Sequence, residues 1–169
     1  MKQISITIEG KDGALDHVVG LLSAGGIDIR ALTVGAAGGR KGIEAKMLVN
    51  DLAAAIDILS REEIPYFVED VLVVAVDDHP GGLHAMLKVL AEARLDLDHL
   101  YGFVSKKEGK ALDVLSVKDH ARAAAALRKH GIVILEEHHP GGRRAAHKDD
   151  DLADYLGSAA YWDEMEPRE

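Results

Sequence analysis

Cysteine is absent from the 169-residue chain, and aromatic residues make up only 4% of it. Without cysteine, the protein has no disulfide, no thiolate nucleophile and no thiolate metal ligand. Hydrophobic residues nevertheless account for 47% of the chain. We therefore expect a folded globular protein whose core is built from alanine, valine, isoleucine and leucine.

Clustered positive charge and long apolar runs are missing as well. The formal net charge is -9, and no segment gathers lysine and arginine into the basic patch that phosphate contacts need. No apolar run approaches the roughly 20 residues of a membrane-spanning helix. We therefore expect neither nucleic acid nor a membrane as partner, and a cytoplasmic location.

The chain does contain an internal repeat, at an offset of 68 residues and without gaps. Gly13 corresponds to Gly81, Asp28 to Asp96 and Asp51 to Asp119, along with many apolar positions. Such a period marks a duplicated folding unit. The predicted domains are residues 1–68 and 69–137, followed by an acidic tail, 138–169. Units this small bury little core alone, so we expect them to pack together or to oligomerise.

Each copy has the pattern strand, helix, strand, strand, helix, strand. Ile4, Ile6 and Ile8 alternate with polar residues, as in a half-buried strand. The next helix carries apolar residues at i, i+3, i+4 and i+7 in both copies: Leu15, Val18, Val19 and Leu22, or Leu83, Met86, Leu87 and Leu90. This order predicts an α+β fold of two tandem ferredoxin-like βαββαβ domains, each an antiparallel sheet with both helices on one face.

Local signals predict where the helices begin and end. Gly25 and Gly26 are expected to end the first helix. Asp51 and Asp119 are suitable N-caps for the second helix of each copy. In the tail, Leu152, Tyr155 and Leu156 are spaced as on one face of a short amphipathic helix, which we expect to dock on an apolar surface.

The sheet face away from the helices differs between the copies. The first copy places Ser5 and Thr7 there. The second copy places apolar residues there, namely Val73, Ala75, Leu112 and Val114. An exposed apolar patch is unusual on a monomer, so we expect the tail, a second subunit or the first copy to cover this face.

A short motif follows the first strand of the second copy: Asp78-His79-Pro80-Gly81-Gly82-Leu83. Together with the element order and the repeat length, it resembles an ACT domain, in which an acidic or polar residue, Pro-Gly and an apolar residue open the first helix. The first copy keeps Gly13 and Leu15 but has Gly10 and Asp12 in place of the acid and the proline. The resemblance covers residues 1 to about 136.

The resemblance implies a function. ACT domains bind small effectors, most often amino acids, and report that binding to an enzyme or transcription unit. It therefore implies a stand-alone, non-catalytic regulatory protein without cofactor or metal, with a free amino acid as effector. A homodimer and a partner enzyme of amino-acid metabolism are the expected assemblies. Physical chemistry agrees, since glycines allow close approach of a ligand and a helix N-terminus attracts a carboxylate.

In ACT assemblies the loop of one domain faces the second strand of a neighbouring domain, so the implied site is a seam. The candidate ligand-binding residues are Asp78, His79, Pro80, Gly81, Gly82, Leu83, Asp98, Leu100 and Tyr101 in the second copy, and Lys11, Gly13, Ala14 and Leu15 in the first. Asp78, Asp98 or a backbone carbonyl of the second strand would accept from the ammonium group. The second copy is favoured because it keeps the full motif, although Lys11 offers the first copy a cation for a carboxylate.

Other interpretations remain open. Glycine and proline between a strand and a helix also serve simply to make a turn. A small ferredoxin-like enzyme would use Asp78, His79 and His99 as acid and base, but no nucleophile is placed beside a base. A purely structural or partner-binding module is the remaining alternative. The nine histidines do not form a recognisable metal-binding motif.

Overall fold

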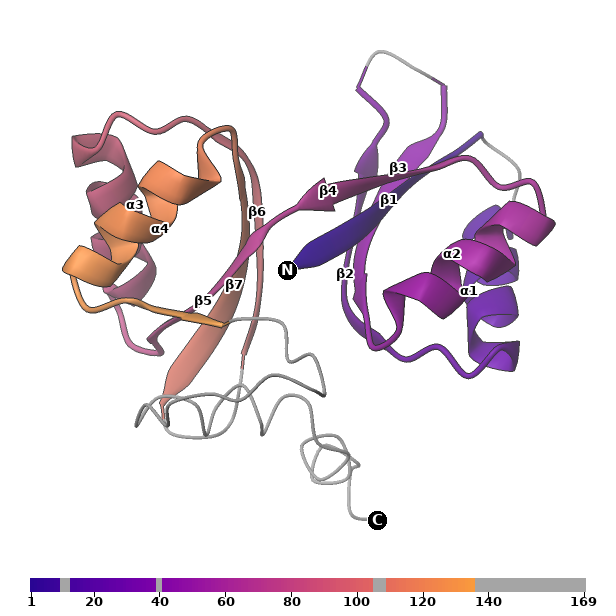
Figure 1. Ribbon diagram of the computed structural model, residues 1–169, viewed down its shortest axis with the longest axis horizontal. Helices are drawn as coiled ribbons and strands as arrows, with labels where there is room; N and C mark the ends of the chain where they lie inside the picture. Colours follow the sequence, from indigo (N-terminus) through magenta and orange to yellow (C-terminus); the bar gives the residue numbers. More distant parts are fainter. Residues whose placement is uncertain (10–12, 39–40, 105–108, 136–169) are drawn as a thin grey trace. The chain divides into compact units, whose positions relative to one another are not determined.

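The computed structural model describes residues 1–9, 13–38, 41–104 and 109–135, and it divides the chain into two compact units (Figure 1). The first unit is Lys2–Asp70, and the second comprises Met1 and the described residues from Val71 onward. The tail at 138–169, with its expected amphipathic helix, and Lys11 lie outside the described residues. No helix in the described ranges is long and apolar enough to cross a membrane.

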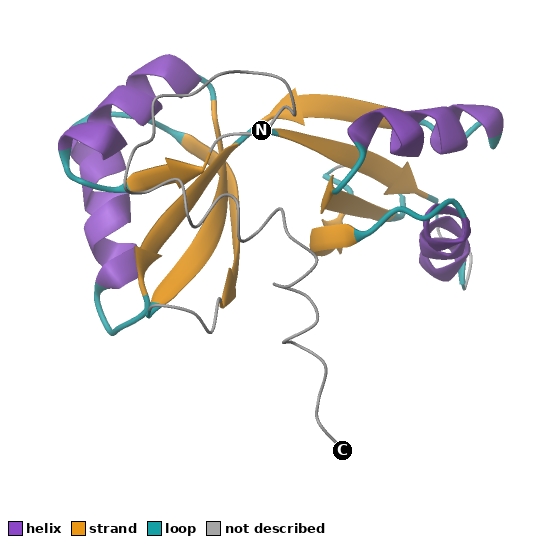
Figure 2. Ribbon diagram, turned by 60° about the horizontal axis from the view of Figure 1, so that its bottom comes forward, coloured by secondary structure: helices purple, strands orange, loops and turns teal. Residues whose placement is uncertain are grey.

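The predicted order of elements is confirmed in the first unit. It contains β1 (Lys2–Ile8), α1 (Ala14–Ala24), β2 (Ile29–Ala36), β3 (Ile43–Val49), α2 (Leu52–Arg61) and β4 (Tyr66–Asp70). The strands form one antiparallel sheet in the order β2-β3-β1-β4. Both helices cover one face of this sheet (Figures 1 and 2).

The second unit repeats this arrangement. It contains β5 (Leu72–Asp77), α3 (Gly82–Glu92), β6 (Leu97–Val104), β7 (Lys110–Val117), α4 (His120–Lys129) and β8 (Val133–Leu135). Its antiparallel sheet has the order β6-β7-β5-β8. The fold is therefore α+β, with two ferredoxin-like units in tandem, as predicted.

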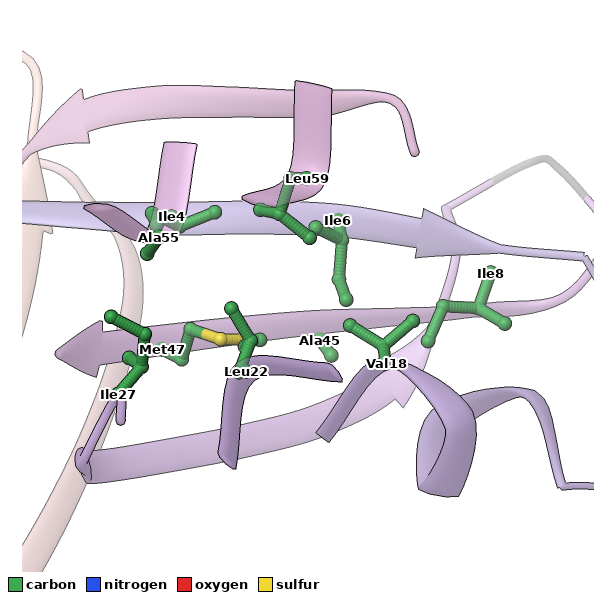
Figure 3. Packing of buried hydrophobic residues seen from close by; sticks show 10 residues of the cluster. All are labelled: Ile4, Ile6, Ile8, Val18, Leu22, Ile27, Ala45, Met47, Ala55 and Leu59. Carbon is green, nitrogen blue, oxygen red and sulfur yellow. The ribbon is translucent and has the colours of Figure 1, made fainter. Parts of the chain in front are cut away.

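The core of each unit lies between the sheet and its helices. In the first unit, Ile4, Ile6 and Met47 are fully buried and pack with Leu22 and Leu59 of the helices (Figure 3). The corresponding residues of the second unit form an equivalent cluster around Val74, Met86, Leu90, Leu115 and Leu127. The other sheet face of the second unit is also buried, including Val73, Ala75, Leu112 and Val114.

The helices begin in two different ways. Asp51 and Asp119 confirm the predicted N-caps of α2 and α4, because their carboxylates accept from the backbone N–H groups of Ala54 and Arg122. By contrast, α1 and α3 begin after Gly13 and Gly81, which adopt left-handed φ angles of 81° and 105° and provide no side-chain cap. The repeat therefore has one capped and one uncapped helix start in each unit.

All the helices described end in the same motif. The residue at each end has a left-handed φ angle: 75° for Gly26, 53° for Glu63, 53° for Arg94 and 74° for Gly131. The N–H of the next residue, an isoleucine or leucine, donates to a leucine carbonyl in the last turn: Ile27 to Leu22, Ile64 to Leu59, Leu95 to Leu90 and Ile132 to Leu127. This is the Schellman arrangement, which favours glycine at the left-handed position. Only two of the four positions have one.

Asp113 is an exception in the second core. It occupies the position of Ala45 in the first unit, on the helix-facing side of β7 between Ala111 and Leu115. Only 6% of its surface is exposed. Burial raises the pKa of the Asp113 carboxyl above its ordinary value of 3.8. The second core therefore contains a titratable group that the first core lacks.

Glu63→Gly and Arg94→Gly are each expected to raise the free energy of unfolding by about 1 kcal/mol. A side chain in the left-handed region costs about 1–2 kcal/mol, and the greater flexibility of glycine in the unfolded chain offsets part of that gain. Gly26→Ala and Gly131→Ala are the matched controls, because an added Cβ would contact nothing at either position. These two should lose stability in urea unfolding. Equal effects for all four changes would contradict the prediction.

Asp113→Asn is expected to remove one component of the pH dependence of stability. The folded state holds the Asp113 proton more tightly than the unfolded chain does. The free energy of unfolding of the natural protein therefore falls as pH rises from 3.8 through the raised pKa of Asp113. Urea unfolding at a series of pH values should show the variant gaining stability relative to the natural protein across that window. Parallel pH profiles would refute this expectation.

Candidate functional site

The candidate site is the loop that joins β5 to α3. The N–H of Asp78 donates to the Gly109 carbonyl over 2.7 Å, and the N–H of Gly82 donates to the His79 carbonyl over 3.0 Å. Gly81 is left-handed, with a φ angle of 105°. At Gly82, a Cβ atom would lie 1.9 Å from the carbonyl oxygen of Asp77. Both glycines are therefore needed to make this turn, whatever else they do.

The start of α3 lacks the negative partners that helix starts usually have within their own turn. Gly81 provides no side-chain cap, and the first turn contains no acidic residue. The N–H of Ala85 is bonded to the Gly81 carbonyl, whereas the N–H groups of Leu83 and His84 have no hydrogen-bond partner within the described residues. Free N–H groups and the helix dipole together favour a bound anion at this position.

The corresponding loop of the first unit differs in two ways. Ala14 stands where Gly82 does, so that turn accommodates a Cβ atom. Asp16 lies in the first turn of α1, where α3 has His84. Because a carboxylate already sits near the positive end of α1, that helix start is less suited to a second anion. Gly13, Ala14 and Leu15 of the predicted site lie together at this helix start.

A charged pair holds the base of the second-unit loop. The Lys110 ammonium lies 2.6 Å from one oxygen of Asp77, and Nε2 of His79 lies 3.8 Å from the other. The hydrogen bond and charge of Lys110 hold the pKa of Asp77 below its ordinary value, with a smaller contribution from His79. Neither Asp77 nor Lys110 is part of the motif. The signal for this pair lies in the strand register, which places the two residues opposite each other.

The remaining predicted residues fall into two groups. Asp78, His79 and Pro80 are exposed in the loop, and Leu83 is 42% exposed on the first turn of α3. Asp98, Leu100 and Tyr101 lie on β6 and do not join them within this unit. β6 runs in the same direction as β5, so Asp98 lies near the opposite end of the sheet, about 20 Å of strand from the loop.

Neighbouring residues of β6 also face opposite sides. Leu100 packs against the helix-side core, whereas Tyr101 lies on the other face, 9% exposed, with its ring stacked on His99. The two side chains therefore do not line one surface. Among the described residues, no three histidine, aspartate or glutamate side chains gather closely enough to hold a metal ion.

Comparison with known proteins places these features in a family. The family model described as an ACT domain pair matches residues 1–139. A solved structure from Bacteroides thetaiotaomicron is similar with a TM-score of 0.73, at 22% sequence identity over 79% of this chain and 90% of that one. No curated protein matches the chain.

Two further similar structures are regulatory subunits of aspartate kinase. The subunit from Thermus flavus has a TM-score of 0.55 and 17% identity, over 76% of this chain and 90% of that one. The ligand-free subunit from Thermus thermophilus has the same TM-score and coverage, with 18% identity. At these identities the likeness establishes a shared fold.

Lys110→Gln is expected to raise the pKa of Asp77 toward its ordinary value, because the neighbouring cation is removed. Carboxyl NMR titration of the two proteins measures this directly. Lys88→Gln is the matched control, since Lys88 pairs with Glu92 on α3 and should leave Asp77 unchanged. An Asp77 titration that is the same in all three proteins would contradict the assigned cause.

Proposed function

The chain belongs to the ACT domain pair family, and from this we propose that it is a non-catalytic regulatory protein that binds a free amino acid. The observation that carries the proposal is the start of α3, which has neither a side-chain cap nor a first-turn acid and follows the two glycines of the loop. The regulatory aspartate kinase subunits of similar fold support a regulatory role.

The effector binds through both of its charged groups. Its carboxylate accepts hydrogen bonds from the N–H groups of Leu83 and His84, at the positive end of α3. Its ammonium needs a carboxylate or a carbonyl oxygen. Asp78 is the available acid in the loop, since Asp77 already pairs with Lys110.

The wall of the site comes from a second copy of the chain. Asp98 lies too far along β6 to reach the loop of its own unit, and Tyr101 faces the side of the sheet away from the helices. In a homodimer, β6 of the other copy supplies them, and closed two-fold dimers are the commonest assembly. Binding at such a contact favours one arrangement of the copies over another, which is how the signal reaches a partner enzyme.

The second unit is the principal binding unit. Asp16 places a carboxylate in the first turn of α1, and a bound carboxylate there would meet like charge. The first turn of α3 has no acid. The first unit thus keeps the fold of the site while its helix start favours anions less.

A thermal-shift screen against the twenty amino acids, followed by calorimetry, tests the function. We expect one amino acid to raise the melting temperature of the protein, because a ligand that binds the folded state stabilises it by mass action. If none of the twenty does so, the effector proposal fails and a partner-binding module takes its place.

His84→Asp tests the site, because it gives α3 the first-turn acid that α1 has in Asp16. The added carboxylate should stabilise the free protein by about 0.3–1 kcal/mol and yet abolish the shift caused by the amino acid. The two effects have opposite signs, so simple damage to the fold does not reproduce them. Asp16→His is the matched control, which should destabilise α1 and leave the ligand shift intact. A full shift in His84→Asp would place the effector elsewhere.

A further inference from the structure

The Asp113 carboxyl lies beside a glycine of the edge strand β6. Asp113 and Gly102 are directly opposite each other on β7 and β6. A Cβ atom on Gly102 would lie 2.3 Å from Oδ1 of Asp113, so the carboxyl occupies the space that any other residue at this position would fill. Gly102 itself is exposed, and β6 is one of the two edge strands of its sheet. The carboxyl therefore reaches toward the sheet edge.

The first unit shows that the fold does not need this acid. There the same two positions hold Ala45 and Val34, which are also directly opposite each other. Ala45 is fully buried, and both residues of this cross-strand pair are apolar. The second unit therefore has Asp113 where the first has Ala45, and Gly102 where the first has Val34. The glycine leaves room for the larger carboxyl side chain.

The buried Asp113 carboxyl lacks a hydrogen-bond or charged partner among the described residues. No hydrogen bond or ion pair from the described part of the chain reaches the Asp113 carboxyl, which is 6% exposed. Removing a carboxylate from water without a compensating partner is unfavourable. A cationic ligand group would supply that partner, and Gly102 places no side chain between the carboxyl and the sheet edge.

We propose that Asp113, reached across Gly102, is a subsite for the ammonium or guanidinium group of the effector's side chain, so that the effector is a basic amino acid. The inference rests on the proposed function, since it assigns the side-chain end of the same ligand. Asp113 lies on the sheet face that α3 covers, three residues beyond Lys110, and is therefore about 10 Å along β7 from the base of the loop.

The reach of lysine is of the same order as this distance along β7. Its carboxylate would bind at the start of α3, and its four-carbon stem would carry the ammonium toward Asp113. The stem and the hydrogen bonds at the two ends of the ligand together span about 10 Å. A neutral side chain of the same length would leave the carboxylate unpaired and would gain no charge-assisted hydrogen bond.

Calorimetry with L-lysine and L-norleucine tests the subsite, because norleucine has a similar length and no side-chain charge. The intact protein should bind lysine at least about tenfold more tightly than norleucine. The double variant Asp113→Ala with Gly102→Val recreates the Ala45–Val34 pair, so its core should remain well packed. It should lose the preference for lysine and bind norleucine as the intact protein does. Asp113→Asn, which keeps the shape of the side chain, should lose the preference as well.

Two results would overturn the subsite and leave amino-acid binding standing. One is equal affinity for lysine and norleucine in the intact protein. The other is an undiminished lysine preference in the folded double variant, verified by circular dichroism. If neither ligand binds and the other amino acids also fail to bind, the proposed function itself is overturned and the subsite with it.

Discussion

The alternation of side chains along the central strand of each sheet is the constraint on which the rest of the structure depends. Every second residue of β1 and β5 faces the helices, so Ile4, Ile6 and Val74 anchor the two cores. A shift of one residue in register would turn these side chains away from the helices. Because β5 is held in this register, its last residue, Asp77, comes to lie opposite Lys110. The position of the loop and of the start of α3 follows from that pairing.

The two copies diverge where this constraint leaves side chains free. On the face of the first sheet away from the helices, Gln3 and Ser5 are buried. Both side chains donate to the Glu69 carboxylate, over 2.8 and 2.7 Å. The second unit has valine at both positions that correspond to Gln3 and Ser5, namely Val71 and Val73. A buried polar group is tolerated when it is hydrogen-bonded, and the first copy meets that condition. Asp113 does not meet it within the described residues. The lack of a partner among the described residues, at a position where the first copy has alanine, supports the proposed role of Asp113 in ligand binding.

Periodic and local features could be predicted from the sequence, and features that depend on register could not. The repeat, the order of elements, the helix-facing residues and the caps Asp51 and Asp119 all follow from spacing along the chain. The pairing of Asp77 with Lys110 requires the register of two strands separated by a helix and a hairpin. The helix ends show a different limit. Glycine predicts a left-handed residue, but Arg94 adopts that conformation without being glycine, because the surrounding Schellman hydrogen bonds impose it.

The start of α3 differs from every other helix start that the structure describes. Two of the others have an aspartate cap, and the third has an acid in its first turn. An N-cap typically contributes about 1 kcal/mol to the free energy of unfolding. The start of α3 has neither an aspartate cap nor an acid in its first turn. The tight contact of Gly82 with Asp77 and the bond from Lys110 to Asp77 nevertheless hold its first turn in place. The other three described helices each have a carboxylate at their start, as a cap or in the first turn, and the absence of one at α3, on a fixed loop, supports the proposed anion site. In the proposed function, the carboxylate of an amino acid supplies that charge.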